Sequence, residues 1–420
     1  MMFKSAFCLY LFVYIAFTCL ASFKDDEILP HGTWRDLTPQ ELDAWYSPFD
    51  LCMMNTSDYD KSPQLIKREH CSTASVKIAA TGAVGICRVG MGSNKKECSA
   101  PYAGRKSYRR GIDGYTDAFA TPLIEAFQRF SDTNTVLVLL GDSTMTQKRL
   151  ALDCELQRES GPKMRINGTK GSKGVLPCHS KESVKMIQVI DKNTRLPAFV
   201  DVHGINMGPS SLPCLEGWTK GQKRPPEDYF EMARKILKDI NFVSGKNMFV
   251  VANAGLWFND KKQFSRSVDS MLNWLSDVAS TPGFRNLVYW HETMAQHWPN
   301  ELKNGYFDLT LGKIHKEQMN DTKWKENPVT YQVPGCCVDI EDKREEVDWR
   351  NSIIKQRLKE MEIKNVHIMP FADITKEAAD MHVCSPHTTK QDCTHYCYWP
   401  LLWQYLWHSL AHYSKKLILQ

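Results

Sequence analysis

Residues 135–150, TVLVLLGDSTMTQKRL, decide the fold class of this chain. The six apolar or β-branched residues that begin at Thr135 are typical of a strand buried on both faces, as in a parallel sheet. The strand ends in Gly141, Asp142 and Ser143, and the residues after it have the apolar spacing of a helix. This order of strand, turn and helix predicts one βα unit of an α/β domain.

The same alternation continues along the chain. Apolar runs predict further strands at residues 184–190, 199–202, 247–252, 286–290 and 365–369. Apolar residues at three- and four-residue spacing predict helices at residues 145–158, 227–240, 264–279, 349–362 and 399–413. We therefore expect residues 116–420 to form a three-layer α/β/α sandwich with a central, mostly parallel sheet.

Residues 1–22 have the layout of a signal peptide. An apolar stretch from Ala6 to Leu20 follows the opening MMFK and precedes the small residues Ala21 and Ser22. An uncleaved membrane anchor is the alternative, because residues 5–23 are uncharged and a membrane span needs about 20 residues. Either reading predicts the secretory pathway, with the protein secreted or held in the Golgi lumen. Contact with a membrane is expected only if the segment is retained.

Cysteines and glycosylation sequons agree with that compartment. Removal of Cys8 and Cys19 from the fourteen cysteines leaves twelve, an even number that suits disulfides, and no CxxC pair argues for zinc. Residues 23–115 hold four of these cysteines and few periodic apolar stretches, so we expect a disulfide-stapled N-terminal segment. Candidate N-glycosylation sites are Asn55, Asn167 and Asn320.

Composition and missing motifs exclude several classes of protein. The chain is 42% hydrophobic and 24% charged, as in ordinary globular proteins, and its net charge of +5 is spread along the sequence. The basic run at residues 105–110 is more typical of solvated surface than of a nucleic-acid site. No P-loop, dinucleotide-binding glycine loop or GxSxG elbow occurs, and His291 and His297 lack the spacing of HExxH. We expect no metal, no cofactor and no nucleic-acid partner.

Ser143 is the candidate nucleophile. A side chain at the carboxyl end of a parallel strand faces the crevice where doubly wound folds bind ligands, and the helix behind it offers N–H groups to a developing oxyanion. Gly141 would let the chain turn sharply. The alternative is that Asp142 or Ser143 only caps the helix, and a serine is a poor nucleophile without a base nearby.

The candidate base lies in residues 391–400, QDCTHYCYWP, just before the last predicted helix. Asp392 and His395 can meet within one turn of chain, so the carboxylate can orient the imidazole and stabilise the imidazolium that forms when His395 takes the serine proton. Cys393 and Cys397 are candidates for a disulfide that staples this loop. A local turn or cap is the alternative for such a pair, but the upstream GDS favours a triad of Ser143, Asp392 and His395.

These blocks resemble the SGNH, or GDSL, hydrolase superfamily, which has GDS after its first strand and DxxH before its last helix. Residues 392–397 (DCTHYC) resemble the DCxHWC block of the plant trichome-birefringence-like and PC-esterase group. Residues 253–257 (NAGLW) resemble its NxGxWW segment, and residues 289–298 (YWHETMAQHW) resemble its FxRTxSPxHF segment. The sequence departs from the group at His291, where the group has Arg, at Met294 and Ala295, where it has Ser-Pro, and at Pro400.

The resemblance implies an SGNH-like fold and a role for each matched residue. Ser143 would attack an ester carbonyl, His395 would act as base and then as acid, and Asp392 would orient it. The oxyanion hole would comprise the backbone N–H of Ser143, a glycine N–H from a middle loop and the side chain of Asn253.

The middle glycine and Asn253 each have an alternative reading. Gly204 follows a predicted strand and is the expected glycine, with Gly208 as its competitor. Asn253 closes a predicted strand, which would place it at a carboxyl end, but it is also suited to a turn before Gly255.

Aromatic side chains suggest the class of substrate. We expect Trp257, His297 and Trp399 to contact substrate, with packing as the alternative. The resemblance implies an acylated carbohydrate or glycan. The predicted function is a serine esterase that acts through an acyl-enzyme on O-acetyl or other O-acyl esters. A glycan O-acetyltransferase with the same triad is one alternative, and a catalytically silent carbohydrate-binding or interaction protein is another.

Overall fold

The computed structural model of the protein describes the following residues: 34–36, 110–112, 123–145, 148–149, 152, 156, 164–167, 179–186, 198–207, 227–256, 258, 261–298, 340, 349–378, 382–383, 392–396 and 400–419. The expected signal peptide and the sequons at Asn55 and Asn320 lie outside these residues, as does most of the expected N-terminal segment. Asn167 lies in a described strand, although its side chain is not described.

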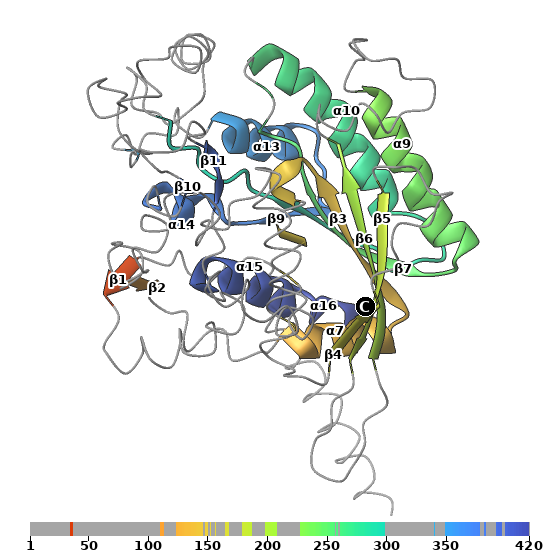
Figure 1. The fold of residues 1–420 in the computed structure, drawn as a ribbon. Helices are drawn as coiled ribbons and strands as arrows, with labels where there is room; N and C mark the ends of the chain where they lie inside the picture. Colours follow the sequence, from red (N-terminus) through yellow and green to blue (C-terminus); the bar gives the residue numbers. More distant parts are fainter. Residues whose placement is uncertain are drawn as a thin grey trace, which may run out of the picture.

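A seven-stranded mixed sheet forms the centre of the molecule (Figure 1). Its order is β4-β5-β6-β3-β7-β8-β9. The strands are β3 (Thr135–Gly141), β4 (Met164–Asn167), β5 (His179–Met186), β6 (Ala198–Asn206), β7 (Asn247–Asn253), β8 (Leu287–His291) and β9 (Val366–Met369). Strands β6, β3, β7, β8 and β9 are parallel neighbours, whereas β5 is antiparallel to β4 and β6. The parallel strands follow the order 2-1-3-4-5 of doubly wound sheets, which confirms the prediction of an α/β fold with a mostly parallel sheet.

Strand β3 lies in the middle because both of its faces are apolar. Leu137 and Leu139 enter a core on one face, while Val136, Val138 and Leu140 enter a second core on the other face. Successive side chains of a strand point to opposite faces, so each face of such a strand has to be covered.

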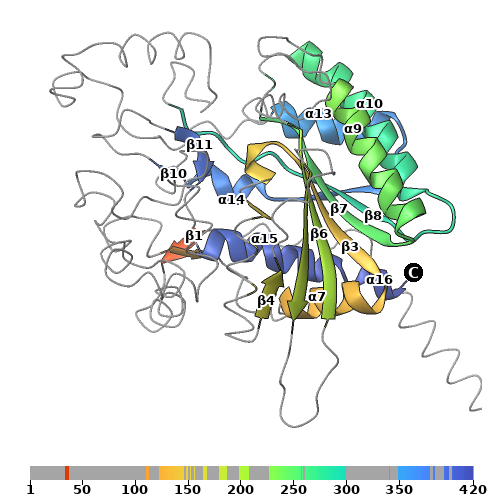
Figure 2. The same cartoon turned by 45° about the vertical axis from the view of Figure 1, so that its right-hand side comes forward.

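Helices cover both faces of the sheet (Figure 2). One core includes α7 (Leu123–Asp132), α15 (Pro400–Tyr413) and α16 (Lys416–Leu419). The other includes α9 (Glu227–Lys238), its π-helical extension η6 (Asp239–Val243), α10 (Lys261–Ala279) and α13 (Trp349–Glu360). The sheet and the two groups of helices make three layers.

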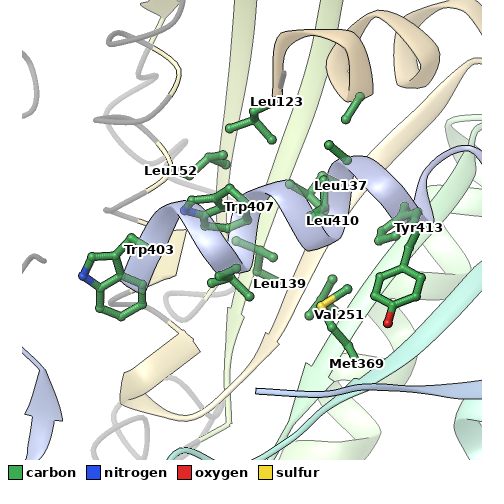
Figure 3. Packing of buried hydrophobic residues seen from close by; sticks show 14 of the residues in the cluster. Leu123, Leu137, Leu139, Leu152, Val251, Met369, Trp403, Trp407, Leu410 and Tyr413 are labelled. Atoms are coloured by element: carbon green, nitrogen blue, oxygen red, sulfur yellow. The ribbon is translucent and has the colours of Figure 1, made fainter. Parts of the chain in front are cut away.

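Helix α15 closes one face with large aromatic side chains. Trp403 and Trp407 are fully buried. Figure 3 shows Trp407 and Leu410 lying among apolar residues of α7 and β3. The helix begins at Pro400, one residue later than predicted, and proline suits the first turn because it has no N–H to leave unbonded.

Some elements differ from the sequence predictions. Strand β5 begins five residues earlier and ends four residues earlier than predicted, and β4 and α7 were not predicted. Residues expected to form a loop before the last helix instead form β11 (Asp392–Tyr396), which pairs with β10 (His382–Val383) near the short helix α14 (Ala372–Lys376). A further small pair joins β1 (Trp34–Asp36) to β2 (Arg110–Ile112). Among the described helices, none has the length and apolar character needed to cross a membrane.

Candidate active site at the carboxyl edge of the sheet

The candidate nucleophile lies at the point where the sheet changes its winding direction. Helical residues after β3, such as Met145, pack on the face of α7 and α15, whereas α10 after β7 packs on the opposite face. Gly141 at the end of β3 pairs with Asn253 of β7 on one side and with Asn206 of β6 on the other. Ser143 follows two residues later, and doubly wound folds bind ligands at this kind of edge.

Glycine is required at position 141 because no Cβ fits there, and not because the chain turns. The residue still belongs to β3, and its φ is not positive. A Cβ added at Gly141 would collide with the backbone oxygen of Asn253 and press on the Cβ of Met145. Gly255 is confined in the same way, because a Cβ there would collide with the side chain of Thr293. Close packing of the two strand ends therefore explains both glycines.

Asp142 caps the helix that begins at Ser143. Its Oδ1 accepts hydrogen bonds from the backbone N–H of Thr144 at 2.9 Å and from the Thr144 hydroxyl at 2.6 Å. Its Oδ2 accepts a longer bond of 3.3 Å from the N–H of Leu256, beyond the end of β7. An N-cap carboxylate accepts from the second N–H of the helix, as here. Asp142 therefore caps the helix, so capping does not explain the presence of a serine at position 143.

Asn253 joins the ends of β7 and β8. Its side chain is fully buried, and its Nδ2 donates to the backbone oxygen of His291 at 2.7 Å and to Thr293 Oγ1 at 3.1 Å. Its Oδ1 accepts a long bond of 3.4 Å from the N–H of Gly255, which matches the turn-forming alternative. Both amide hydrogens have protein acceptors in this arrangement. A role as oxyanion donor, which remains a prediction, requires one of them to change partner.

Lys148 and His291 form a buried pair behind the candidate nucleophile. Lys148 Nζ lies 3.1 Å from His291 Nδ1, and both side chains are almost fully buried. His291 Nδ1 also lies 2.7 Å from the backbone oxygen of Glu292, which can only accept, so Nδ1 carries the hydrogen. An uncharged Lys148 amine can share that hydrogen, whereas an ammonium cannot. The geometry therefore favours a neutral lysine.

Electrostatics act on this pair in the same direction. Burial lowers the pKa of Lys148 to about 7, although the nearby Asp142 raises it. Burial and the neighbouring lysine hold the pKa of His291 well below its ordinary value. With hydrogen on Nδ1, Nε2 of His291 is an acceptor, and it is buried without a hydrogen-bond partner among the described residues. A polar group left in this state is unusual in a folded protein and is often found at functional sites.

The segment after β8 connects this edge to the strand that contains the DxxH motif. The N–H of His297 donates to the backbone oxygen of Cys393 at 2.9 Å, and the Tyr396 hydroxyl donates to the backbone oxygen of Ala295 at 2.6 Å. The strand ends of β3, β7 and β8 are linked through Asn253, so hydrogen bonds connect all four sequence motifs at one edge of the sheet.

Strand β11 is interrupted by a large bulge at the DxxH motif. Asp392 and Tyr396 are paired with Val383 and His382, which are adjacent residues of β10. In a regular strand, residues three apart point to opposite faces and lie roughly 10 Å apart. The bulge shortens this path, and bulges re-aim side chains near functional sites. The side chains of Asp392 and His395 are not described, so their meeting with Ser143 remains a prediction.

Gly204 and His297 are two other predicted site residues that the structure describes, and neither lies in the environment that its predicted role needs. Gly204 sits inside β6, paired with Leu139 on one side and Ser180 on the other, so a loop N–H from this region would have to come from beyond Asn206. The ring of His297 is fully buried, and its Nε2 donates to the backbone oxygen of Lys376, which is a structural environment. Outside the described residues lie Gly208, Trp257, Cys397 and Trp399.

Cys393 is disulfide-bonded. Its partner lies among the cysteines that the structure does not describe, because Cys393 is the single cysteine within the described residues. The pairing with Cys397 therefore remains a prediction. A disulfide at this position adds a covalent restraint to the bulge of β11.

A second pair of bases, one half-buried and one buried, lies on β5 and β6. His179 Nε2 and His203 Nδ1 are 2.8 Å apart, and the rings are stacked. Burial lowers the pKa of His179 to about 4 and that of His203 to about 3, so both rings stay neutral at ordinary pH. The described residues contain no cluster of three or more His, Cys, Asp or Glu side chains suited to a metal ion.

Sequence reasoning missed Lys148, although a signal was present. Met145, Lys148 and Leu152 are spaced by three and four residues, so they share one helical face, and all three are buried. A lysine within an apolar stripe is unusual enough to mark a functional candidate. His291, by contrast, was considered only as part of an HExxH motif, which its spacing excludes, and as a departure from a family motif.

Comparisons of the chain with protein-family models, with curated proteins and with solved structures found no match.

Proposed function

We propose that this protein is an SGNH-type serine esterase that acts through an acyl-enzyme on O-acetyl or other O-acyl esters of carbohydrates. Ser143 is the nucleophile, His395 is the base and Asp392 orients it. The proposal rests on the sequence motifs together with the arrangement of the described residues.

The observation that supports the proposal most is the position of Ser143. It is the first residue of a helix at the carboxyl end of β3, next to β7, and Asp142 performs the capping that would otherwise explain a serine there. A backbone N–H at a helix N-terminus is suited to stabilise the negative charge of a tetrahedral intermediate. The docking of β11 on the segment after β8 brings the backbone of the DxxH motif to the same edge.

The proposed reaction has two steps. Ser143 Oγ attacks the carbonyl carbon of the ester while His395 takes the hydroxyl proton. The bond between the acyl carbon and the sugar oxygen then breaks, and His395 returns the proton to that oxygen. In the second step water attacks the acyl-serine and His395 takes a proton from it. The bond between the acyl carbon and Ser143 Oγ then breaks, His395 returns the proton to Oγ, and the free acid leaves.

Hydrolysis of p-nitrophenyl acetate by the purified full-length protein tests the proposal. We expect Ser143→Ala to lose the protein-dependent rate, because no other group replaces the nucleophile. Thr144→Ser is the matched control, because it alters the adjacent residue but keeps a hydroxyl that can bond to Asp142. Equal rates for the wild type and Ser143→Ala would reject the esterase.

A labelled O-acetyl donor separates the esterase from the O-acetyltransferase alternative. The wild-type protein is incubated with an acetyl-labelled sugar ester and a panel of glycan acceptors. An esterase releases label as free acetate, whereas a transferase moves label into the acceptors. Ser143-dependent label in an acceptor would replace hydrolysis by transfer as the proposed activity.

A further inference from the structure

Strand β11 lies outside the central sheet, and its backbone needs support from elsewhere. It pairs only with the two-residue strand β10 among the described residues, and residues 393–395 fall in the bulge. Bulged residues lose the regular ladder of hydrogen bonds, so strand pairing does not fix their conformation. The backbone that holds the candidate base is therefore positioned mainly by other contacts.

Thr394, in the middle of the bulge, makes the most specific of these contacts. Its Oγ1 accepts a hydrogen bond from Gln296 Nε2 at 2.8 Å and another from Trp298 Nε1 at 2.9 Å. A hydroxyl oxygen has two lone pairs for acceptance, so these two donors match its capacity. Both donors come from the segment that follows β8.

The Gln296 amide depends on this hydroxyl. Gln296 is buried, and its Oε1 has no hydrogen-bond partner among the described residues, so the amide gains its described bond from Thr394 alone. If the amide is turned over, the Thr394 hydroxyl is still the partner, then as the donor. Trp298 Nε1 can only donate. A buried amide and an indole N–H thus converge on one oxygen.

We propose that Thr394 is a positioning residue, whose hydroxyl is clamped by Gln296 and Trp298 and thereby fixes the bulge that holds Asp392 and His395 opposite the nucleophile. This inference rests on the proposed esterase function. Two side-chain hydrogen bonds from the segment after β8 restrain the bulge in more directions than a single bond does.

Catalysis is sensitive to such positioning. A displacement of about 1 Å in a catalytic group can reduce a rate by about 100-fold. Loss of the clamp is therefore expected to act on kcat, because the substrate-binding surface is not altered. Removal of the hydroxyl takes this acceptor away from the buried Gln296 amide and from the half-buried Trp298 indole, so the bulge has to rearrange.

Two substitutions at Thr394 test the clamp by kinetics. Thr394→Val has nearly the same shape but no acceptor, and we expect it to lower kcat for p-nitrophenyl acetate by roughly 10- to 100-fold with KM within about threefold. Thr394→Ser keeps the acceptor and should retain kcat within about threefold. The pH profile of kcat/KM should also move in Thr394→Val, which a loss of folded protein alone does not cause.

The imidazole of His395 gives a readout that needs no activity. Exchange of its C2 hydrogen for deuterium, followed by mass spectrometry across a pH series, reports the pKa of that ring. We expect Thr394→Val to change this pKa and Thr394→Ser to leave it as in the wild type, with His412 of α15 unchanged in both. If Thr394→Val does not fold, Trp298→Phe removes one donor and keeps an aromatic side chain, and the same change in the pKa of His395 is expected.

The two proposals fail in different ways. A wild-type protein without Ser143-dependent turnover rejects the esterase, while the exchange of His395 still decides whether the clamp exists. Thr394→Val with wild-type kcat and an unchanged pKa of His395 overturns the clamp, whatever the activity of Ser143→Ala.

Discussion

The two edges of the central sheet each bury an asparagine, but the surroundings of the two residues differ. At the amino edge, Asn286 and Asn241 exchange amide hydrogen bonds at 2.9 and 3.1 Å, and Asn286 also accepts from Met248 N and donates to the backbone oxygen of Val278. At the carboxyl edge, Asn253 is equally buried and bonded. Next to it, however, lie a histidine nitrogen without a described partner and a buried lysine with a strongly lowered pKa.

This difference separates a polar cluster whose groups satisfy one another from one that contains a polar atom without a described partner. Both polar side-chain atoms of Asn286 have partners, so its cluster resembles an ordinary buried network. The carboxyl edge keeps a buried lysine and a histidine nitrogen, Nε2 of His291, that has no hydrogen-bond partner among the described residues, and such groups cost free energy. Proteins tolerate such groups mostly where they serve a function. The same edge contains Ser143, which agrees with the proposed site.

The largest expected effect comes from Asn253→Ala compared with Asn286→Ala. Each variant removes a buried amide, so both should lower the free energy of unfolding, by about 1–3 kcal/mol. If Asn253 also stabilises the oxyanion, its variant should lower kcat for p-nitrophenyl acetate by a further factor of about 100 to 1,000. Urea unfolding and kinetics on the same samples measure the two effects.

Asn286→Ala is the control in that experiment, because it lies at the opposite edge. Equal kcat values for the two variants would give Asn253 a purely structural role. Only the buried lysine, Lys148, and the histidine nitrogen of His291 without a described partner would then distinguish the two edges.

The next effect in size is on packing at the carboxyl edge. Gly141→Ala places a methyl group against the backbone of Asn253, which cannot move without shifting β7. We expect the free energy of unfolding to fall by about 3 kcal/mol, because overpacking against backbone forces strand displacement. The midpoint of urea unfolding measures the loss.

Ser143→Ala serves as the control, since it alters a residue two positions away and adds no atom. It should leave the midpoint nearly unchanged. A wild-type midpoint for Gly141→Ala would show that the two strand ends are less tightly packed than the distances indicate.

The smallest effect is a gain of stability from Lys148→Met. The pKa of Lys148 is about 7 in the folded protein and 10.5 ordinarily, so the unfolded chain binds more protons between these pH values. Stability of the wild type should therefore rise with pH from about 7 to 10.5, to the extent that other groups allow. Methionine has no charge to desolvate, so the free energy of unfolding of Lys148→Met at pH 7 should be higher than that of the wild type by about 1 kcal/mol. The variant should also lack the part of the rise in stability with pH that is due to Lys148.

Lys238→Met, at the exposed end of α9, is the control for a lost surface charge. It should leave the pH dependence of unfolding as in the wild type. If Lys148→Met is destabilised equally at pH 7 and pH 10, the amine contributes a favourable hydrogen bond. The polar groups at the two edges would then be satisfied to a similar extent.

Much of the fold could be predicted because its signals are local. The apolar run of β3 and the periodic stripes of α10 and α13 can be read from neighbouring residues, and these three elements lie within a few residues of their predicted positions. Most of the helix predicted at residues 145–158 lies outside the described residues. The bulge of β11 could not be predicted, because it depends on pairing with β10 and on contacts with Thr394 from a segment about 100 residues earlier. The position of antiparallel β5 was predicted wrongly because its first half is polar and gives no apolar signal. Its register is set by pairing with β6.

By itself, the sequence determined the alternation of strands and helices and the candidates Ser143, Asp392 and His395, because residue type and spacing are sufficient to recognise them. Only the tertiary structure decided which residues meet. It set Gly141 against Asn253, brought Lys148 to His291 across 143 positions, and assigned the capping of the helix to Asp142. The physical reason is that contacts between distant residues follow from strand order and register, and these depend on how two whole faces of the sheet pack, which no local pattern encodes.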